Sequence, residues 1–252
     1  MPNAWALVNA VLRSAAAMQG TVREPTSYAD RYSHPDELIS LLKANLPKGK
    51  LEPMLIADNA APRTVVQVNT LRISAEELAE RLTAEHVCVQ PPEGMADGLV
   101  LSCTGSLELL PAFREGLFYV QDPAAKLSIL CAGLPESGGN VLDCCAAPGG
   151  KSFAAAIAMG GQGSIVSCDI YPHKTATIEN GAARLGLTNI TARQQDASQG
   201  VQEWVGAMDT VIADVPCSGL GVIGQKQDIK YKMSEKRQQD IIRLQRNNLS
   251  VV

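Results

Sequence analysis

The chain lacks the features that mark membrane and secreted proteins. No apolar run among its 252 residues approaches the roughly 18 residues that a membrane span needs. The N-terminus also lacks the basic and then apolar pattern of a signal peptide. We therefore expect a cytoplasmic protein without a membrane partner.

Cysteine and histidine are few and irregularly spaced. The seven cysteines are an odd number without a regular spacing, which argues against a fold built on disulfides. No two cysteines are separated by two residues, and only three histidines are present, which argues against a zinc site. We expect no metal.

Basic residues are not in excess. Lys and Arg number 22 against 26 Asp and Glu, and the formal net charge is −4. Phosphate contacts usually need a basic face, so the composition does not favour a nucleic-acid partner. A net charge says nothing about local patches, however, and RNA binding stays open. The hydrophobic content of 46% is typical of a globular chain with a buried core.

The first half of the chain is predicted to begin with helices and to continue as a small mixed module. A helix over residues 4–18 has no capping residue before it, so we expect missing upstream sequence, with a natural helical N-terminus as the alternative. A second helix is predicted over 35–46. A third, over 74–84, begins with a capping box of Ser74 and Glu77. Strands are predicted at 65–69, 87–90, 99–102 and 118–120.

The second half of the chain alternates strands with helices from about residue 140. This alternation is typical of a parallel, doubly wound sheet. The predicted fold class is therefore α/β, a Rossmann-like sheet preceded by a small α+β module. The strands are predicted at 141–144, 164–168, 190–193 and 208–214, and the helices up to about 159 and at 172–185 and 234–249.

A run of small residues follows the first of these strands. Residues 142–151 read L-D-C-C-A-A-P-G-G-K, and a helix is predicted directly afterwards. Small residues allow a ligand close to the backbone, and a helix N-terminus offers unpaired N–H groups to an anion. Gly-Gly alone would suggest an ordinary tight turn, but the full run favours a binding loop for a carboxylate or a phosphate.

Acidic residues follow the next two strands. Asp169 ends the second strand, where an acid in a doubly wound fold can bind the ribose hydroxyls of a nucleoside. Asp196 follows the third strand and could accept a hydrogen bond from an adenine amino group. The alternatives are a solvated acid at Asp169 and a turn cap at Asp196.

A carboxyl and a thiol lie close together after the fourth strand. Residues 214–218 read D-V-P-C-S and place Asp214 and Cys217 at the same edge of the predicted sheet. A thiolate is a strong nucleophile when its pKa is lowered. The alternative is a cysteine buried in a turn, which the neighbouring Asp-x-Pro disfavours.

Together these runs resemble the Sun/RsmB family of bacterial rRNA cytosine-C5 methyltransferases, within the wider NOL/NOP/Sun group. Asp169 and Asp196 match the family's two cofactor-binding acids, and Asp214 begins a match to D-A-P-C-S in which Val215 replaces alanine. Residues 221–223 and 228–230 match the segment that follows. The cofactor loop C-A-A-P-G-G-K is matched by Cys145, Ala146, Ala147, Pro148, Gly149, Gly150 and Lys151.

The resemblance implies three regions. Residues 1–20 would be the remnant of a NusB-like helical domain, 21–125 linker helices with an RNA-binding-type extension, and 126–252 a truncated methyltransferase domain. The implied cofactor is S-adenosylmethionine, bound by the loop, Asp169, Asp196 and Asp214. The implied partner is 16S rRNA, with no DNA and no membrane.

The resemblance also implies roles in catalysis. Cytosine C5 is a poor nucleophile until a thiolate adds at C6, after which C5 can take a methyl group. In the family a later cysteine, in a Thr-Cys motif, attacks C6, and the Pro-Cys cysteine assists release. No cysteine follows Cys217 in the chain. Cys217 would therefore have the helper role, Asp214 would hold the base edge, and Lys151 would lie near this group.

Three other hypotheses stay open at this point. In DNA cytosine-C5 methyltransferases the Pro-Cys cysteine attacks, which would make Cys217 the nucleophile, but the loop and the Asp-Ile-Lys segment argue against this class. A dinucleotide-dependent oxidoreductase needs G-x-G-x-x-G, which is absent. A truncated chain could also bind cofactor or RNA without turnover. Such a chain should expose sheet edge and apolar helix face, and we expect it to aggregate or to unfold broadly.

Overall fold

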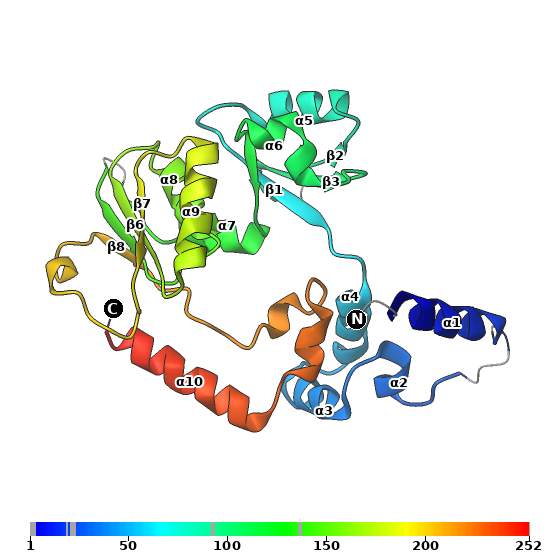
Figure 1. Cartoon of the computed structure of the whole chain (residues 1–252). Helices are drawn as coiled ribbons and strands as arrows, with labels where there is room; N and C mark the ends of the chain where they lie inside the picture. Colours follow the sequence, from blue (N-terminus) through cyan, green and yellow to red (C-terminus); the bar gives the residue numbers. More distant parts are fainter. Residues whose placement is uncertain (1–3, 19, 21–23, 92–93, 136–137, 252) are drawn as a thin grey trace. The chain divides into compact units, whose positions relative to one another are not determined.

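The computed structural model describes residues 4–18, 20, 24–91, 94–135 and 138–251. The chain divides into two compact units (Figure 1). Unit 1 comprises Met1–Ala61 and Gly219–Met233, and unit 2 comprises Pro62–Ser218 and Ser234–Val252. Within the described residues no helix is long and apolar enough to cross a membrane. Residues 1–3 and 19 of the predicted N-terminal remnant lie outside the described residues.

Unit 1 is helical. The predicted helices at 4–18 and 35–46 are present as α1 (Ala4–Ala17) and α3 (Asp36–Asn45). Two further helices, α2 (Tyr28–Tyr32) and α4 (Leu51–Asn59), were not predicted. The short 3-10 helices η3 (Leu220–Val222) and η4 (Gln227–Tyr231) belong to the same unit. Its core consists of Leu38, Leu42, Leu55 and Ile223.

Unit 2 begins with an antiparallel sheet whose strand order is β2-β3-β1-β4. Its strands are β1 (Thr64–Val68), β2 (Cys88–Gln90), β3 (Gly98–Ser102) and β4 (Phe118–Val120). The predicted capping box at Ser74 and Glu77 begins α5 (Ala75–Ala84). The connection from β3 to β4 contains η1 (Leu107–Leu109) and α6 (Pro111–Arg114). Alternate strand residues pack against α5, and Val66, Leu78 and Phe118 are fully buried between them.

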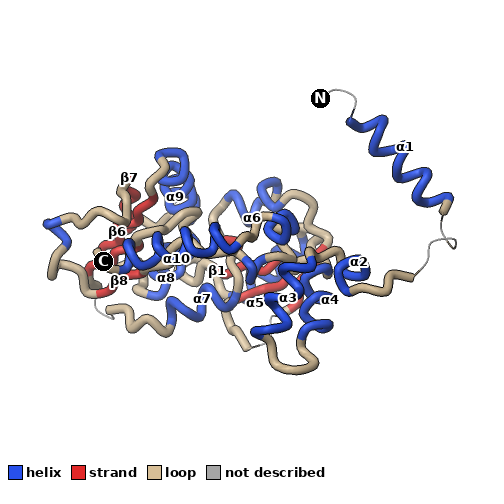
Figure 2. The backbone as a smooth tube through the Cα atoms, turned by 90° about the horizontal axis from the view of Figure 1, so that it is seen from below, coloured by secondary structure: helices blue, strands red, loops and turns tan. Residues whose placement is uncertain are grey.

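The second sheet of unit 2 is parallel, in the order β7-β6-β5-β8 (strands red in Figure 2). Its strands are β5 (Asn140–Asp143), β6 (Ser164–Asp169), β7 (Ile190–Gln194) and β8 (Thr210–Ile212). The helices are α7 (Pro123–Leu130), α8 (Gly150–Ala158), α9 (Pro172–Leu185) and α10 (Glu235–Leu249), with η2 (Gln202–Trp204) before β8. The predicted fold class is confirmed, although β8 is shorter than predicted.

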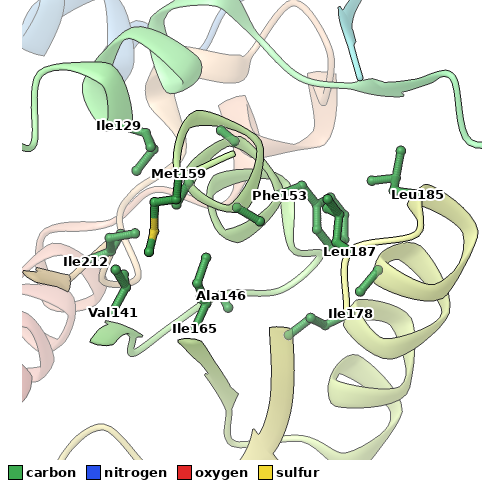
Figure 3. Packing of buried hydrophobic residues seen from close by; sticks show 14 of the residues in the cluster. Ile129, Val141, Ala146, Phe153, Met159, Ile165, Ile178, Leu185, Leu187 and Ile212 are labelled. Carbon is green, nitrogen blue, oxygen red and sulfur yellow. The ribbon is translucent and has the colours of Figure 1, made fainter. Parts of the chain in front are cut away.

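An apolar cluster joins this sheet to α7, α8 and α9 (Figure 3). Val141 and Ile165 of the central strands pack against Phe153 of α8 and Ile178 of α9, and all four side chains are buried. Tyr119 of β4 meets the Phe153 ring edge-on, with 5.9 Å between the ring centroids. The antiparallel module therefore packs against α8, the helix that follows residues 145–149.

Polar contacts also hold the antiparallel module against α9. Asn69 is fully buried, and its Nδ2 donates to the carbonyls of Gly116 (3.0 Å) and Leu185 (2.9 Å). From α9, the Nη1 atom of Arg184 donates to the carbonyls of Phe113 (2.6 Å) and Phe118 (3.0 Å). Because buried donors are costly to leave unpaired, these contacts fix the module on the parallel sheet.

Candidate functional site

The loop between β5 and α8 requires glycine at one position. Gly149 has a φ of 109°, in the left-handed region. A Cβ added there would lie 2.4 Å from Cζ of Phe153, which is too close for any side chain. The α8 helix begins at Gly150, and no side chain caps it at Gly149. Without a side-chain cap at this position, the first N–H groups of α8 can donate to an anion, and the binding of one stays a prediction.

A buried chain of polar groups supports the loop from below. Asp143, at the end of β5, is fully buried. Ser152 Oγ donates to Asp143 Oδ2 (2.7 Å), and Ser167 Oγ donates to Ser152 Oγ (2.7 Å). Among the described residues, Asp143 Oδ1 has no hydrogen-bond partner. Burial raises the pKa of the Asp143 carboxyl to about 6, although the hydrogen bond from Ser152 opposes this rise.

Sequence reasoning gave Asp143 no role. Asp143 lies inside the run of residues 142–151, but only the small residues of that run form a recognisable pattern. The available signal was an ionisable residue at the end of an apolar strand, because such a group is rarely buried without a structural or functional reason.

The two acids at the next strand ends occupy the predicted positions. Asp169 ends β6 and is 7% exposed, its Oδ1 accepts from the Tyr171 backbone N–H (3.1 Å), and its Oδ2 lies 3.5 Å from Lys174 Nζ. Asp196 follows β7, and its Oδ1 accepts from the N–H (2.9 Å) and the Oγ (2.7 Å) of Ser198. These bonds lower the pKa of Asp196. With these bonds Asp196 caps a turn, which is the alternative role given for it above. Its role in cofactor binding therefore stays a prediction.

An ion pair joins the predicted cofactor loop, residues 145–151, to residues 214–218, called here the Pro-Cys loop. Lys151 Nζ lies 2.5 Å from Asp214 Oδ2, although the two residues are 63 positions apart in the chain. The Asp214 side chain remains 56% exposed, so it stays open to a further partner. Cys217 is also exposed, but in the described part of the chain no hydrogen bond links it to Lys151 or Asp214. The predicted grouping is thus present for the lysine and the aspartate, and Cys217 lies three residues further along.

The thiols near the loop are poor nucleophiles. Burial raises the pKa of Cys145 to about 11 and the pKa values of Cys144 and Cys168 to about 12. A thiol with such a pKa is protonated at neutral pH, and only the thiolate attacks. Of the cysteines in the predicted site, only Cys217 is exposed; Cys145 is half-buried.

A glutamine from the antiparallel module also lies beside the loop. Gln121 follows β4 and is 7% exposed, and its Nε2 would lie 3.3 Å from a Cβ added to Gly150. The backbone carbonyl of Gln121 accepts from Gln67 Nε2 (3.1 Å), which fixes this turn of the chain. Sequence reasoning missed Gln121 because a single glutamine after a strand carries no pattern.

A pocket of about 440 Å³ lies beside the parallel sheet. Leu142, Cys168 and Trp204 are among its lining residues, as are Gln195 and Ala197 on either side of Asp196. Residues 145–151, Asp169 and Asp214 do not line it. We therefore do not equate this pocket with the predicted cofactor site, which is built from the loop and the strand ends.

Two protein-family models match the chain. Residues 132–252 match a family described as 16S rRNA methyltransferase RsmB/F. Residues 34–108 match a ferredoxin-like domain of RsmF/B-like methyltransferases. The second match begins within unit 1 and covers three of the four strands of the antiparallel sheet.

Curated relatives and a solved structure agree with these matches. A probable ribosomal RNA small subunit methyltransferase B of Synechocystis is 32% identical over 91% of this chain and 52% of its own length. The corresponding protein of Bacillus subtilis is 33% identical over 97% of this chain and 55% of its own length. The chain thus spans about half the length of these relatives. A methyltransferase homolog from Pyrococcus horikoshii is 25% identical, with a TM-score of 0.68 over 88% of this chain and 71% of that chain.

Proposed function

The chain belongs to the RsmB/F family of 16S rRNA methyltransferases, and we propose that it supplies the cofactor site and part of the catalytic site for methylation of a cytosine at C5. Membership in this family supports S-adenosylmethionine as the cofactor. The observation that carries the proposal is the ion pair of Lys151 and Asp214, which joins the cofactor loop to the Pro-Cys loop.

The residues around the loop fit the three parts of S-adenosylmethionine. The methionine carboxylate would accept from the N–H groups at the start of α8, which no side chain of the N-cap residue Gly149 caps. The ribose hydroxyls would donate to Asp169, and the adenine amino group would donate to Asp196. The loop residues Cys145, Ala146, Ala147 and Pro148 are small or compact and allow this close approach.

The catalytic roles follow from charge and exposure. The bound cofactor supplies an electrophilic methyl group. Asp214 holds the cytosine edge through its exposed carboxylate, and Lys151 orients that carboxylate through their ion pair. Cys217 supplies an exposed thiol that assists release of the methylated base. The family's attacking cysteine would come from its Thr-Cys motif, which residues 218–252 do not contain.

The finer substrate assignment is part of the same proposal. The substrate would be a cytosine in 16S rRNA, in the cytoplasm, without DNA or a membrane as partner. The antiparallel module would contact the RNA, and its fixed attachment to α9 through Asn69 and Arg184 would keep it in register with the cofactor loop.

A second candidate function is cofactor or RNA binding without turnover. The thiols of Cys144, Cys145 and Cys168 favour it, because burial raises their pKa values to about 11 or 12 and keeps them protonated at neutral pH. Under this hypothesis the site described above binds its ligands but lacks an attacking thiolate of its own.

Calorimetric titration with S-adenosylmethionine tests the cofactor assignment. Asp169→Ala removes the expected ribose acceptor and should weaken binding by about tenfold to a hundredfold, as expected for one charge-assisted hydrogen bond. Glu179→Ala removes an exposed acid of α9, is the control, and should bind as the unchanged chain does. Equal affinities for the two variants would show that Asp169 does not bind the ribose.

A further inference from the structure

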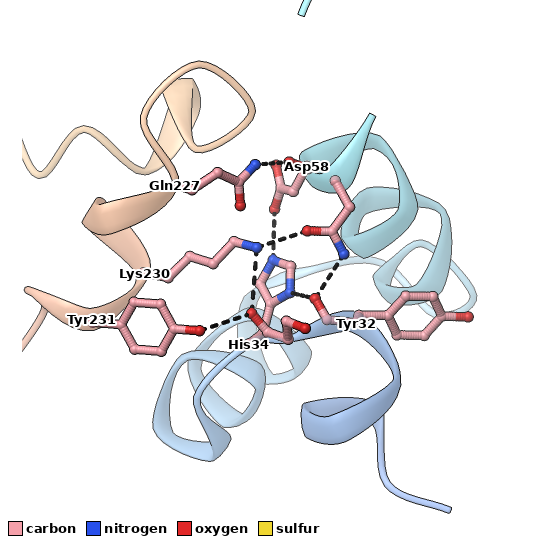
Figure 4. A network of polar contacts seen from close by, with 8 residues as sticks. Tyr32, His34, Asp58, Gln227, Lys230 and Tyr231 are labelled. Atoms are coloured by element: carbon pink, nitrogen blue, oxygen red, sulfur yellow. Dashed lines mark hydrogen bonds and ion pairs between the residues drawn. The ribbon is translucent and has the colours of Figure 1, made fainter. Parts of the chain in front are cut away.

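The buried polar groups of unit 1 are paired with one another (Figure 4). Lys230 is 3% exposed, and its Nζ lies 2.7 Å from Asn59 Oδ1 and 3.3 Å from the carbonyl of Ser33. His34 is 2% exposed, and its Nε2 lies 3.3 Å from Asp58 Oδ2. Because buried polar groups need partners, these contacts stabilise unit 1. A pair of reactive groups outside the predicted site lies in unit 2.

Two exposed cysteines lie on neighbouring strands of the antiparallel sheet. Cys88 is the first residue of β2 and lies opposite Ser102, the last residue of β3. Cys103 follows Ser102 directly, and both cysteines are free thiols. Both side chains are exposed, so a reagent can reach them from solvent. The register of the sheet thus brings together two thiols that lie far apart in the sequence.

The backbone turns Cys103 away from the core. Side chains along a strand alternate between its two faces. Leu101 is 3% exposed on the core face and pairs with Val89, so Ser102 and its partner Cys88 face outward. A regular strand would point Cys103 back to the core, but its φ of 59° lies in the left-handed region and its side chain is exposed. This conformation is uncommon for residues other than glycine and recurs at functional sites.

The two thiols contact each other. A hydrogen bond with Cys103 raises the pKa of Cys88, and the charge of a Cys103 thiolate raises it further. A hydrogen bond with Ser102 opposes this rise. Two sulfur atoms in hydrogen-bond contact need only a small movement to reach the length of a disulfide bond, about 2.05 Å. Within the described residues no third His, Cys, Asp or Glu side chain joins them to form a metal site.

We propose that Cys88 and Cys103 form a redox-responsive thiol pair, which a low-molecular-weight disulfide converts to a disulfide bond between β2 and the end of β3. One protein thiolate attacks a sulfur of the external disulfide, whose S–S bond breaks and releases a thiolate. The second protein thiolate attacks the protein-bound sulfur of this mixed disulfide and releases the other external thiolate. The two protein thiols thereby lose two electrons and two protons, and the external disulfide is reduced to two thiols.

The new bond would fasten one edge of the antiparallel sheet. The strand β2 has three residues, and in the described part of the chain it pairs only with β3. A short edge strand opens easily because few hydrogen bonds hold it. A bond between Cys88 and Cys103 restricts the unfolded conformations of the chain between them and should slow this opening. The effect depends on β2 and β3 alone, so it does not rest on the function proposed above.

The test compares the full chain with three single variants in mixtures of reduced and oxidised glutathione. Cys88→Ser and Cys103→Ser each remove one partner and keep a small polar side chain. Cys131→Ser is the matched control, because Cys131 is also exposed but follows α7, away from the pair in the sequence. Alkylation followed by peptide mass spectrometry distinguishes an internal disulfide from mixed disulfides with glutathione. Non-reducing electrophoresis separates bonds within one chain from bonds between chains.

We expect the internal disulfide to form at a ratio of oxidised to reduced glutathione about tenfold or more below the ratio that modifies Cys131, because the second thiol is already in place. Hydrogen exchange in β2 and β3 should then slow about tenfold or more, and reduction with dithiothreitol should restore it. Cys131→Ser should behave like the unchanged chain. Cys88→Ser and Cys103→Ser should take up glutathione without slower exchange.

Three results would overturn the proposal. Mixed disulfides on both Cys88 and Cys103, at the ratio that also modifies Cys131, would mean that the two thiols react independently. A bond that joins Cys88 of one chain to Cys103 of another would mean that the pair does not close within the sheet. An internal disulfide with unchanged exchange in β2 would mean that the bond does not fasten the edge strand.

Discussion

The buried carboxyl of Asp143 makes stability depend on pH in an unusual direction. Its pKa rises from 3.8 to about 6 because burial disfavours the charged form. The folded chain therefore holds this proton more tightly than the unfolded chain does. Stability from this group is fully present below about pH 4 and is lost as the pH rises to about 6.

The expected size of the effect follows from the two pKa values. A difference of about 2 corresponds to about 3 kcal/mol of unfolding free energy, since one pH unit corresponds to about 1.4 kcal/mol. Asp143→Asn cannot ionise but keeps an oxygen acceptor for Ser152. The unfolding free energy of this variant, relative to the unchanged chain, should therefore rise by about 3 kcal/mol between about pH 4 and about pH 7.5.

Urea unfolding followed by tryptophan fluorescence measures this difference. The chain has two tryptophans, and Trp5→Phe leaves Trp204, which packs beside Leu142 on the same sheet, as the reporter. Other groups titrate in both chains, so their contributions cancel in the comparison. Ser152→Ala removes a hydrogen bond that lowers the pKa of Asp143 and should enlarge the effect. A difference between Asp143→Asn and its parent that stays constant from acid to neutral pH would refute the reasoning.

Two further predictions concern the cofactor loop and the thiol. Gly149→Ala should lower both the melting temperature and the affinity for S-adenosylmethionine, because its Cβ would lie 2.4 Å from the Phe153 ring and its φ of 109° is strained for alanine. In Gly150→Ala the new Cβ would meet only the Gln121 amide, at 3.3 Å. This variant should therefore lose much less melting temperature and much less affinity in calorimetry than Gly149→Ala. Equal losses in the two variants would contradict the steric argument. In a tritium-transfer assay on unmodified small-subunit rRNA, we expect the 252-residue chain to bind cofactor without transferring methyl. Transfer that Cys217→Ser abolishes would instead assign the attack to Cys217, as in the DNA enzymes.

Local signals in the sequence predicted those parts of the fold that have local causes. The helix at 172–185 was predicted with both ends correct, because Pro172 suits the first helical position and Gly186 takes the left-handed conformation that ends it. The helices α4 and α7 were missed because their apolar residues do not form one stripe. The strand at 208–214 was predicted too long, since its pairing with β5 covers only Thr210–Ile212.

The residues of the candidate site also differ in how far the sequence predicts them. Asp169, Asp196 and Asp214 could be placed because parallel strands end at one edge of the sheet, whatever their separation in the chain. The resemblance to the family implies that Lys151 lies near Asp214, but nothing in the sequence predicts an ion pair between them. No local sequence pattern indicates that residues 219–233 pack on helices more than 150 residues earlier in the chain. Nothing in the local sequence distinguishes Ile223 or Lys230 from other residues, because the helices that bury them lie far away in the chain.

The last prediction concerns the exposed apolar surface beside β8. In the described part of the chain this strand pairs only with β5, and Val211 is 41% and Val205 73% exposed. The opposite edge strand, β7, carries exposed polar residues such as Arg193 and Gln194. Unpaired edges and large apolar patches promote association, so we expect the chain to self-associate through the β8 side and to melt broadly. Light scattering against concentration measures this association. Val211→Lys should reduce it, whereas Thr191→Lys on exposed β7 should not. A monomer with one sharp melting transition would show instead that this surface is too small or too well covered by residues 197–208 to drive association.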